Sequence, residues 1–312
     1  MILVTGCFGF LVSNLCNNLV KREKIVGLDL FDGKRNLEKE FTFVKSENFI
    51  LARADISNTH DLRRVFKKYK FEKVVHLAAK SEPRSQKSKA NSYVITNVIG
   101  TLNLLEECRK NRVKKVVFAS TSNIYGLAKA PFNEEKTKCC QISAYAMTKL
   151  CGELLCKIYS TNYFIDIPCL RFSTVYGENG RKDMAVEKFT KSILSGRKIK
   201  KFGNGESKRD YLYVGDAVNA VLRSLELRLG FEIINIGSGR AISINELINL
   251  IEKETGRKAI VEIVPEPLEN LPTNLLEISK AKRLLNWKPK VQIEDGIREI
   301  CRKKVSRIVK KN

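Results

Sequence analysis

The chain has 312 residues, of which 43% are hydrophobic and 29% are charged. This composition excludes a disordered or repetitive chain and leaves room for one large domain or two ordinary ones. The net charge of +23 suits an anionic substrate, but the basic residues are scattered and no stripe of basic and aromatic residues marks a nucleic-acid surface. We therefore expect no nucleic-acid partner.

The first residues form a short apolar run that ends in a turn at Gly6, without the basic start and apolar stretch of a signal peptide. No stretch is apolar enough to span a membrane. Nine cysteines occur without paired spacing, and only His60 and His76 could join them as metal ligands. We expect a cytoplasmic protein with reduced thiols, no membrane contact and no metal.

The chain opens with a strand, a glycine turn and a helix. Residues 1–5 are apolar, Gly6 and Gly9 follow, and residues 13–21 have helical spacing. A second strand at 25–28 ends at Asp29, roughly 20 residues beyond the turn, where dinucleotide-binding units place a ribose-binding acid. A carboxylate there favours NAD over NADP, because it repels a 2′-phosphate. The alternative is an ordinary turn aspartate.

Alternation then continues to residue 172. The pattern predicts strands at 49–52, 74–78, 116–118 and 165–172, and helices at 61–68, 93–109 and 145–160. Apolar strands between helices are typical of an α/β fold with a doubly wound, Rossmann-type parallel sheet, which binds ligands beyond the carboxyl ends of its strands. The candidate residues at those ends are Gly6, Phe8, Gly9, Asp29, Asp55, Ile56, Ala78, Ala79, Lys80, Ser120, Thr121 and Ser122.

The rhythm loosens after residue 177. Helices are predicted at 184–194 and 216–225, strands at 210–214 and 233–236, a capping box at Ser243 opens a helix that ends at Thr255, and residues 294–309 form a terminal amphipathic helix. We expect an NAD-binding domain over 1–172 with a return segment around 210–236. A smaller α/β substrate-binding domain covers 173–312.

Tyr145 and Lys149 lie four residues apart in the helix predicted at 145–160. At this spacing both side chains leave one face of the helix, and a nearby ammonium favours the phenolate. Tyr145 is therefore a candidate general base, although such a pair also occurs by chance on exposed helices. The leucines and isoleucine of this helix (Leu150, Leu154, Leu155, Ile158) predict its buried stripe.

Seven motifs occur in one order along the chain. They are Gly6 to Phe10, Asp29, His76 to Ala79, Asn97 to Thr101, Thr121 with Tyr125 and Gly126, Tyr145 with Lys149, and Arg209 to Tyr211. Together they resemble the extended short-chain dehydrogenase/reductases of the NAD-dependent epimerase/dehydratase family, which act on nucleotide sugars. The resemblance implies catalytic residues Thr121, Tyr145 and Lys149. It implies that NAD is bound by Gly6, Phe8, Gly9, Phe10, Leu11, Asp29, Asp55, Ile56, Leu77, Ala78, Ala79, Lys80, Asn97, Ser120, Tyr145 and Lys149.

Within that family, residues 170–177 (LRFSTVYG) and 180–185 (GRKDMA) resemble the UDP-glucuronate 4-epimerases, whose pattern is close to LRFFTVYG and GRPDMA. Lys182 replaces the proline. The resemblance implies that Thr174, Arg181 and Arg84 hold the sugar near its carboxylate and that Lys188 and Arg209 meet the diphosphate. Ser122, Thr121 and Tyr145 complete the implied UDP-sugar site.

The resemblance also implies a mechanism and an assembly. Tyr145 takes the proton of the sugar 4-hydroxyl while the C4 hydride moves to NAD, Thr121 holds the sugar oxygen, and Lys149 lowers the tyrosine pKa. The 4-keto sugar then receives the hydride on its other face, which turns UDP-glucuronate into UDP-galacturonate. Family members commonly pair through the helices that correspond to 93–109 and 145–160, so we expect a homodimer.

Two departures keep alternatives open. The third glycine of the family's turn is Val12, which should push the first helix outward or require small neighbours, and the loop at 265–270 lacks the family's arginine. Dehydration of the sugar would need two acids after Thr121, where this chain has Ser122 and Asn123. Epimerisation of UDP-glucose or UDP-N-acetylglucosamine, decarboxylation of UDP-glucuronate, and a non-catalytic protein with weakened cofactor binding remain alternatives.

Overall fold

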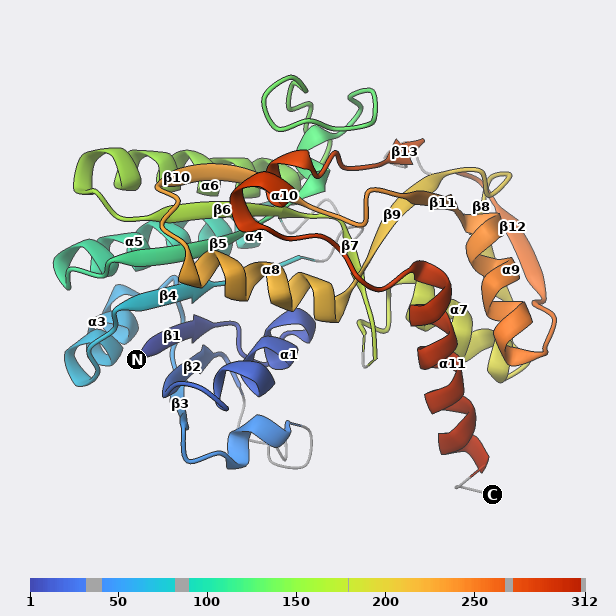
Figure 1. Cartoon of the computed structure of the whole chain (residues 1–312), viewed down its shortest axis with the longest axis horizontal. Helices are drawn as coiled ribbons and strands as arrows, with labels where there is room; N and C mark the ends of the chain where they lie inside the picture. The colour runs from blue at the N-terminus through green and yellow to red at the C-terminus, as the bar shows by residue number, and fades with distance from the viewer. Residues whose placement is uncertain (32–40, 82–89, 179, 267–271, 310–312) are drawn as a thin grey trace. The chain divides into compact units, whose positions relative to one another are not determined.

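The computed structural model describes residues 1–31, 41–81, 90–178, 180–266 and 272–309. The chain divides into two compact units (Figure 1). Unit 1 comprises Met1–Gly126, Cys139–Arg171 and Val218–Ile234, and unit 2 comprises Leu127–Lys138, Phe172–Ala217 and Asn235–Asn312. The assignment of cofactor binding to the first and sugar binding to the second stays a prediction.

Strands and helices alternate through most of unit 1. In chain order the elements are β1 (Ile2–Thr5), α1 (Phe10–Leu19), β2 (Ile25–Asp29), the 3₁₀ turn η1 (Thr42–Lys45), β3 (Phe49–Arg53), α3 (Thr59–Lys68), β4 (Lys73–His76), α4 (Ala90–Tyr93), η3 (Val94–Ile99), α5 (Gly100–Lys110), β5 (Lys115–Thr121), η4 (Ser122–Tyr125), α6 (Ala144–Tyr163) and β6 (Ile167–Phe172). Most of the helix α8 (Val214–Glu226) and of the strand β10 (Phe231–Ile236) belongs to it as well, through Val218–Ile234.

The central sheet has seven strands in the order β10-β6-β5-β4-β1-β2-β3. Strand β1 pairs in parallel with β2 and β4, and Thr5 lies level with Leu28 on one side and His76 on the other. This is the strand order of a Rossmann-type doubly wound sheet, so the predicted fold class is confirmed. The carboxyl ends of β1, β2, β4 and β5, namely Thr5, Asp29, His76 and Thr121, therefore lie along one edge.

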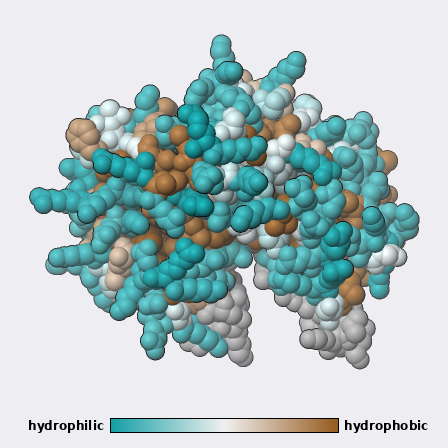
Figure 2. Space-filling model, viewed as in Figure 1, coloured by the Kyte–Doolittle hydropathy of each residue, from teal (hydrophilic) through white to brown (hydrophobic). Residues whose placement is uncertain are grey.

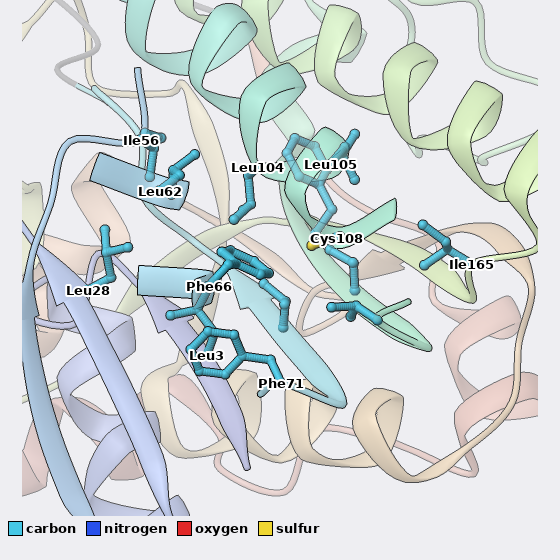
Figure 3. Close-up of a cluster of buried hydrophobic side chains, with 14 of the residues drawn as sticks. Leu3, Leu28, Ile56, Leu62, Phe66, Phe71, Leu104, Leu105, Cys108 and Ile165 are labelled. Atoms are coloured by element: carbon cyan, nitrogen blue, oxygen red, sulfur yellow. The ribbon is translucent and has the colours of Figure 1, made fainter. Parts of the chain in front are cut away.

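One large core holds the sheet of unit 1 to its helices (Figure 3). Leu3 and Leu28 from the strands meet Leu62 and Phe66 of α3 and Leu104 of α5, all of them nearly or fully buried. Burying an aliphatic side chain of this size contributes roughly 1.5–3 kcal/mol. The predicted alternation succeeds because each strand carries a continuous apolar run that only flanking helices can cover.

Unit 2 has its own α/β core. Its elements are β7 (Thr174–Tyr176), α7 (Ala185–Leu194), β8 (Ile199–Phe202), β9 (Lys208–Tyr213), β11 (Ala241–Ser243), α9 (Ile244–Thr255), β12 (Val261–Val264), β13 (Thr273–Asn274), α10 (Ser279–Leu285) and α11 (Ile293–Val309). The predicted capping box at Ser243 and Glu246 is present, with hydrogen bonds in both directions. Ile293, Ile297 and Ile300 of α11 are buried against α7 and α9.

The structure corrects two details of unit 1. The helix predicted at 93–109 is divided, because Val94–Ile99 forms a wide π-helix between α4 and α5. The predicted buried stripe of α6 is wrong for Leu154 and Ile158, which are 54% and 51% exposed, whereas Leu155 packs against the core as expected. The buried face of α6 carries Lys149, Glu153 and Cys156 instead.

Hydrophilic side chains cover most of the face drawn in Figure 2, as the 29% of charged residues suggests. Among the described residues, no helix is both long and apolar enough to cross a membrane. The same residues contain no group of three or more histidine, cysteine, aspartate or glutamate side chains placed to hold a metal ion.

Candidate active site

The glycine turn after β1 is kept narrow by its surroundings. Gly6 has a φ of +74°, and a Cβ there would lie 2.9 Å from the Cα of Ala78. The backbone N–H of Gly6 donates to the Leu28 oxygen at 2.7 Å, and that of Gly9 donates to the Gly6 oxygen at 2.9 Å. The turn leads into α1, whose N-cap Gly9 offers no side-chain cap. The first amide groups of this helix can therefore bind an anionic group.

Val12 does not disrupt the turn. Its side chain is 4% exposed and belongs to the buried face of α1. A Cβ at Gly9 would lie 3.5 Å from the Cγ2 of Val12, which is an ordinary contact distance, so Val12 packs beside the turn without depending on the missing side chain of Gly9. Cys7, in contrast, does need a small neighbour, because a Cβ at Gly27 would lie 3.0 Å from the Cys7 Cβ. Compensation by a small neighbour is therefore found beside Cys7, and the distances do not show one for Val12.

Asp29 closes the turn from β2. One carboxylate oxygen accepts the Phe8 N–H at 2.8 Å and the other accepts the Leu30 N–H at 2.7 Å. These charge-assisted bonds fix the carboxylate at the carboxyl edge of the sheet, beside the turn. The Phe8 ring packs against Phe31 and Phe41, with ring centroids 6.1 and 4.8 Å away.

Asn97 connects three segments of unit 1 from within the π-helix. Its side-chain oxygen accepts the Lys80 N–H at 2.9 Å, and its amide group donates to the Lys80 oxygen and to the Thr148 hydroxyl, each at 3.0 Å. These bonds hold the loop of Leu77, Ala78, Ala79 and Lys80 against α6. A π-helix has a wider turn than an α-helix, and such turns occur often at functional sites. In a regular α-helix the side chain at position 97 would point in another direction, away from Lys80 and Thr148.

His76 is a neutral support of the same edge. Its ring nitrogens lie 2.9 Å from the hydroxyls of Thr5 and Thr101, and the Thr5 hydroxyl accepts the Ala78 N–H at 3.1 Å. Complete burial, with a smaller effect of the Lys149 charge, lowers the pKa of His76 to about 3. His76 therefore orders the loop after β4 and does not act as a base near neutral pH.

Two further predicted positions take different places at this edge. The Asp55 carboxylate accepts the N–H and the hydroxyl of Ser57 at 2.8 and 2.7 Å. The Ile56 side chain is 4% exposed and packs in the core, where a Cβ at Gly100 would lie 2.7 Å from it. Only the backbone of Ile56 can therefore contact a ligand.

The end of β5 presents Ser120, Thr121 and Ser122, all less than 9% exposed. The Thr121 hydroxyl accepts the Asn123 N–H at 3.2 Å, which starts the 3₁₀ turn η4. The Ser120 hydroxyl points to α6 and donates to Glu153 at 2.6 Å. The three hydroxyls are therefore not all directed at one ligand, because the Ser120 hydroxyl is hydrogen-bonded to α6.

Tyr145 and Lys149 occupy the first turns of α6, which is capped by the Ser143 hydroxyl on the Ala146 N–H at 3.2 Å. The Lys149 ammonium donates to the Ala119 carbonyl of β5 at 2.7 Å and lies 4.8 Å from the Phe118 ring centroid. The close approach of α6 to β5 depends on Gly152, because a Cβ there would lie 2.5 Å from the Phe118 ring. Burial lowers the pKa of Lys149 to about 8, against smaller raising effects of Cys156, Glu153 and Cys169.

Sequence reasoning missed a buried ion pair behind these residues. Arg171, at the end of β6, donates two hydrogen bonds of 2.8 and 2.7 Å to the two oxygens of Glu153, and both residues are at most 2% exposed. Glu153 follows Lys149 by four residues, so the spacing that singles out Tyr145 and Lys149 continues for another turn. That continuation is the signal that could have found Glu153.

Unit 2 contributes the other predicted contacts, described on their own. Thr174 of β7 and Arg181 line one small pocket together with Gly177 and Gly180. The Arg181 guanidinium bonds both oxygens of Asp183, at 3.1 and 2.7 Å. Burial by itself would raise the pKa of Asp183, but the hydrogen bonds and charge of Arg181 outweigh it and lower the pKa.

The remaining predicted positions are not gathered in that pocket. Lys188 is exposed on α7, and Arg209 of β9 donates to the Lys208 carbonyl at 2.8 Å. Arg84 and most of the loop at 265–270 lie outside the described residues.

Comparison with known proteins identifies the family of this arrangement. Residues 2–237 match the model of the NAD dependent epimerase/dehydratase family. The chain is 39% identical to a UDP-glucuronate 4-epimerase of Thermodesulfobacterium geofontis over 302 residues, which cover 95% of this chain and 93% of that protein.

Solved structures agree with this relationship. A UDP-glucuronic acid 4-epimerase from Bacillus cereus, in complex with UDP-glucuronic acid and NAD, superposes with a TM-score of 0.87 at 33% identity, covering 97% of this chain and 99% of that one. A UDP-glucose 4-epimerase from Thermotoga maritima, with UDP-glucose, gives 0.89 at 30% identity with the same coverage. The resemblance inferred from the motifs is confirmed, and the chain belongs to the NAD dependent epimerase/dehydratase family.

Proposed function

We propose that the chain is an NAD-dependent epimerase that inverts C4 of a UDP-sugar, and that this sugar is UDP-glucuronate. The observation that carries the proposal is the position of Lys149, buried one turn after Tyr145 and bonded to β5 two residues before Thr121. The relatives named UDP-glucuronate 4-epimerase, which match over most of the chain, support it.

The residues of unit 1 fit NAD. The narrow glycine turn and the uncapped amide groups of α1 suit the diphosphate. The Asp29 carboxylate suits the ribose hydroxyls, and Asn97 orders the loop after β4. When bound, NAD would accept the C4 hydride of the sugar and return it to the opposite face.

The chain's own residues carry the proton transfers. Tyr145 takes the proton of the sugar 4-hydroxyl and returns it after the sugar has turned over, which is a general base and then a general acid. Thr121 donates a hydrogen bond to the same oxygen. The Lys149 ammonium stabilises the phenolate of Tyr145 by its charge, as long as its own pKa of about 8 keeps it protonated.

Arg181 selects the uronic acid in this proposal. A guanidinium pairs with a carboxylate through two parallel hydrogen bonds, and Arg181 already holds Asp183 in that geometry. When the sugar carboxylate takes the place of Asp183, Arg181 keeps its two hydrogen bonds. A neutral hexose has no carboxylate and cannot form them. Thr174, in the same pocket, adds a hydroxyl.

The direct test is incubation of the purified protein with UDP-glucuronate, followed by the coupling of the sugar H4 in NMR. UDP-galacturonate is the expected product. A UDP-pentose would mean decarboxylation, and turnover of UDP-glucose or UDP-N-acetylglucosamine alone would overturn the role of Arg181. Tyr145→Phe should stop turnover while nicotinamide stays with the protein, and a wild-type protein that retains no nicotinamide even after added NAD would contradict the enzyme.

We further propose a homodimer formed through η3 and α6. Ile95, Ile99, Met147, Leu154 and Ile158 are 41–54% exposed, although the same helices bury Lys149 and Glu153. Such an exposed apolar face on neighbouring helices is typical of a contact surface. Light scattering should give twice the chain mass for the wild type and the chain mass for Leu154→Glu, whereas a monomeric wild type would refute the pairing.

We also propose that the protein works in the cytoplasm. All nine cysteines are free and five of them are buried in unit 1, where oxidation would disturb the core. Cell fractionation with thiol labelling tests this, and recovery of an oxidised or exported protein would contradict it.

A further inference from the structure

A second cavity, of about 720 Å³, lies in unit 1 at the sheet edge opposite the candidate active site. It is lined by the first residues of β4 and β5, Lys73 and Lys115, by the ends of α5 and α6, and by residues 225–228. Strand β5 connects the two edges, and its seven residues from Lys115 to Thr121 separate them by roughly 20 Å.

The lining of this cavity is cationic. Six lysines and arginines face three carboxylates, those of Glu72, Asp166 and Glu226. Asp166 is engaged by Lys115 at 2.6 Å, and Glu226 lies 3.6 Å from Arg22. Among the described residues, no ion pair involves the lining cations Lys73, Arg112, Lys114 or Arg228.

Two residues of the lining have a strained backbone. In the described part of the chain only three non-glycine residues have a positive φ, and two of them, Arg112 at +55° and Phe164 at +57°, line this cavity. Helices usually end in such a conformation with glycine or asparagine, because a Cβ disfavours it. Burial does not explain the choice of phenylalanine, since Phe164 is 90% exposed, and its neighbour Tyr163 is 45% exposed.

We propose that this cavity binds a small polyanion that carries a flat ring, of the nucleoside phosphate class. Arg112, Lys114 and Arg228, which form no ion pair with any other described residue, match phosphate groups, and the exposed ring of Phe164 offers a stacking surface to a base. The volume lies within the usual range for small-molecule sites, about 300–1,000 Å³. This site is separate from the proposed epimerase chemistry and does not depend on it.

Calorimetric titration with ATP tests the proposal, using the full-length protein already saturated with NAD and UDP so that the other nucleotide sites are filled. One further binding site per chain is expected. Arg112→Ala and Phe164→Ala should each weaken ATP binding by roughly tenfold or more, the loss typical of a bidentate or stacking contact. Lys157→Ala, which removes an exposed cation of α6 that does not line the cavity, is the matched control.

Absence of a further site, or equal losses in Lys157→Ala and Arg112→Ala, would overturn the proposal. So would tighter binding of a single-stranded oligonucleotide than of ATP, because the cavity would then belong to a nucleic-acid surface. If Phe164→Ala halves the mass measured by light scattering, the ring belongs to the contact between copies and the proposal fails.

Glycine variants separate lost binding from lost folding. Arg112→Gly and Phe164→Gly relieve the positive φ, so the melting temperature should stay equal or rise while ATP binding is lost. A rise in melting temperature with unchanged ATP affinity would show that the two side chains have no part in a site.

Discussion

The Glu153 carboxylate and the Arg171 guanidinium form a two-bond ion pair with almost no exposure to solvent, one turn beyond Lys149. Ser120 joins the same carboxylate at 2.6 Å, and the Arg171 guanidinium lies 4.8 Å from the Tyr125 ring centroid. The pair thus connects α6 to the ends of β5 and β6, directly behind Thr121 and Lys149.

Removal of one partner should be strongly destabilising. Glu153→Gln leaves the Arg171 charge buried without its counter-charge, and we expect a loss of about 3–5 kcal/mol in the free energy of unfolding. Urea denaturation measures it. Glu254→Gln is the control, because the Glu254 pair with Arg298 is partly exposed and is worth about 0–1 kcal/mol. Equal losses in the two variants would contradict a buried pair, and the double variant Glu153→Met/Arg171→Met should recover most of the loss.

Lys149 should give the enzyme an alkaline limit. As pH rises through about 8 the buried ammonium loses its proton, so Tyr145 loses the charge that favours its phenolate and kcat/KM should fall. Lys149→Met should lower activity by about 10²–10⁴-fold and remove that limit. A profile that stays flat well above this pH in the wild type would contradict the assignment.

The titration of Lys149 should raise the stability of the fold with pH, although it lowers activity. The folded pKa of about 8 lies below the ordinary value of 10.5, so between these pH values the unfolded chain binds more protons than the folded one. Stability must therefore rise with pH in that window. The difference in unfolding free energy between wild type and Lys149→Met, measured in urea at several pH values, should grow in favour of the wild type and cease to grow above pH 10.5.

Gly6→Ala should destabilise the folded chain by more than the strain of the positive φ alone explains. The added Cβ would lie 2.9 Å from the Cα of Ala78, which is backbone and cannot move aside, and NAD retention should be lost. Gly196→Ala is the matched control, since Gly196 has a φ of +63° and no atom within 4 Å of the added Cβ. The control should lose about 1–2 kcal/mol and keep its cofactor. Equal melting temperatures and equal retention in both variants would refute the close approach at Ala78.

Arg181→Met should lower kcat/KM for UDP-glucuronate by roughly a hundredfold, the loss expected for a charge-assisted two-bond contact of about 3 kcal/mol. The value for UDP-glucose, where measurable, should change little. Lys182→Met removes a neighbouring exposed cation and serves as the comparison. If both variants lose the same factor, the arginine contributes only general charge.

Local patterns predicted most of unit 1. The glycine turn, Asp29 and the helix of Tyr145 could be located because strand and helix alternate at short range and each carries its own periodicity. Val12 is the exception, because the sequence alone marks it as a defect of the turn, whereas its side chain is buried in α1 and packs at an ordinary distance from Gly9.

Features that depend on distant partners could not be predicted. Strands such as β7 and β13 have three and two residues, and only their pairing with β9 defines them. The partner of Glu153 comes from β6, eighteen residues later in the chain. Leu154 and Ile158 look like core residues by composition, and only the sheet's position shows that α6 turns its polar side inward.

In the π-helix Val94–Ile99 the number of residues is more tightly constrained than their identity. An α-helix rotates by about 100° per residue, so deletion of one residue between Asn97 and Gly100 would turn Asn97 and everything before it out of step with α5. Asn97 would then no longer reach Lys80 and Thr148 together. The segment should therefore tolerate neither insertion nor deletion, even of residues whose side chains make no contact with Lys80 or Thr148.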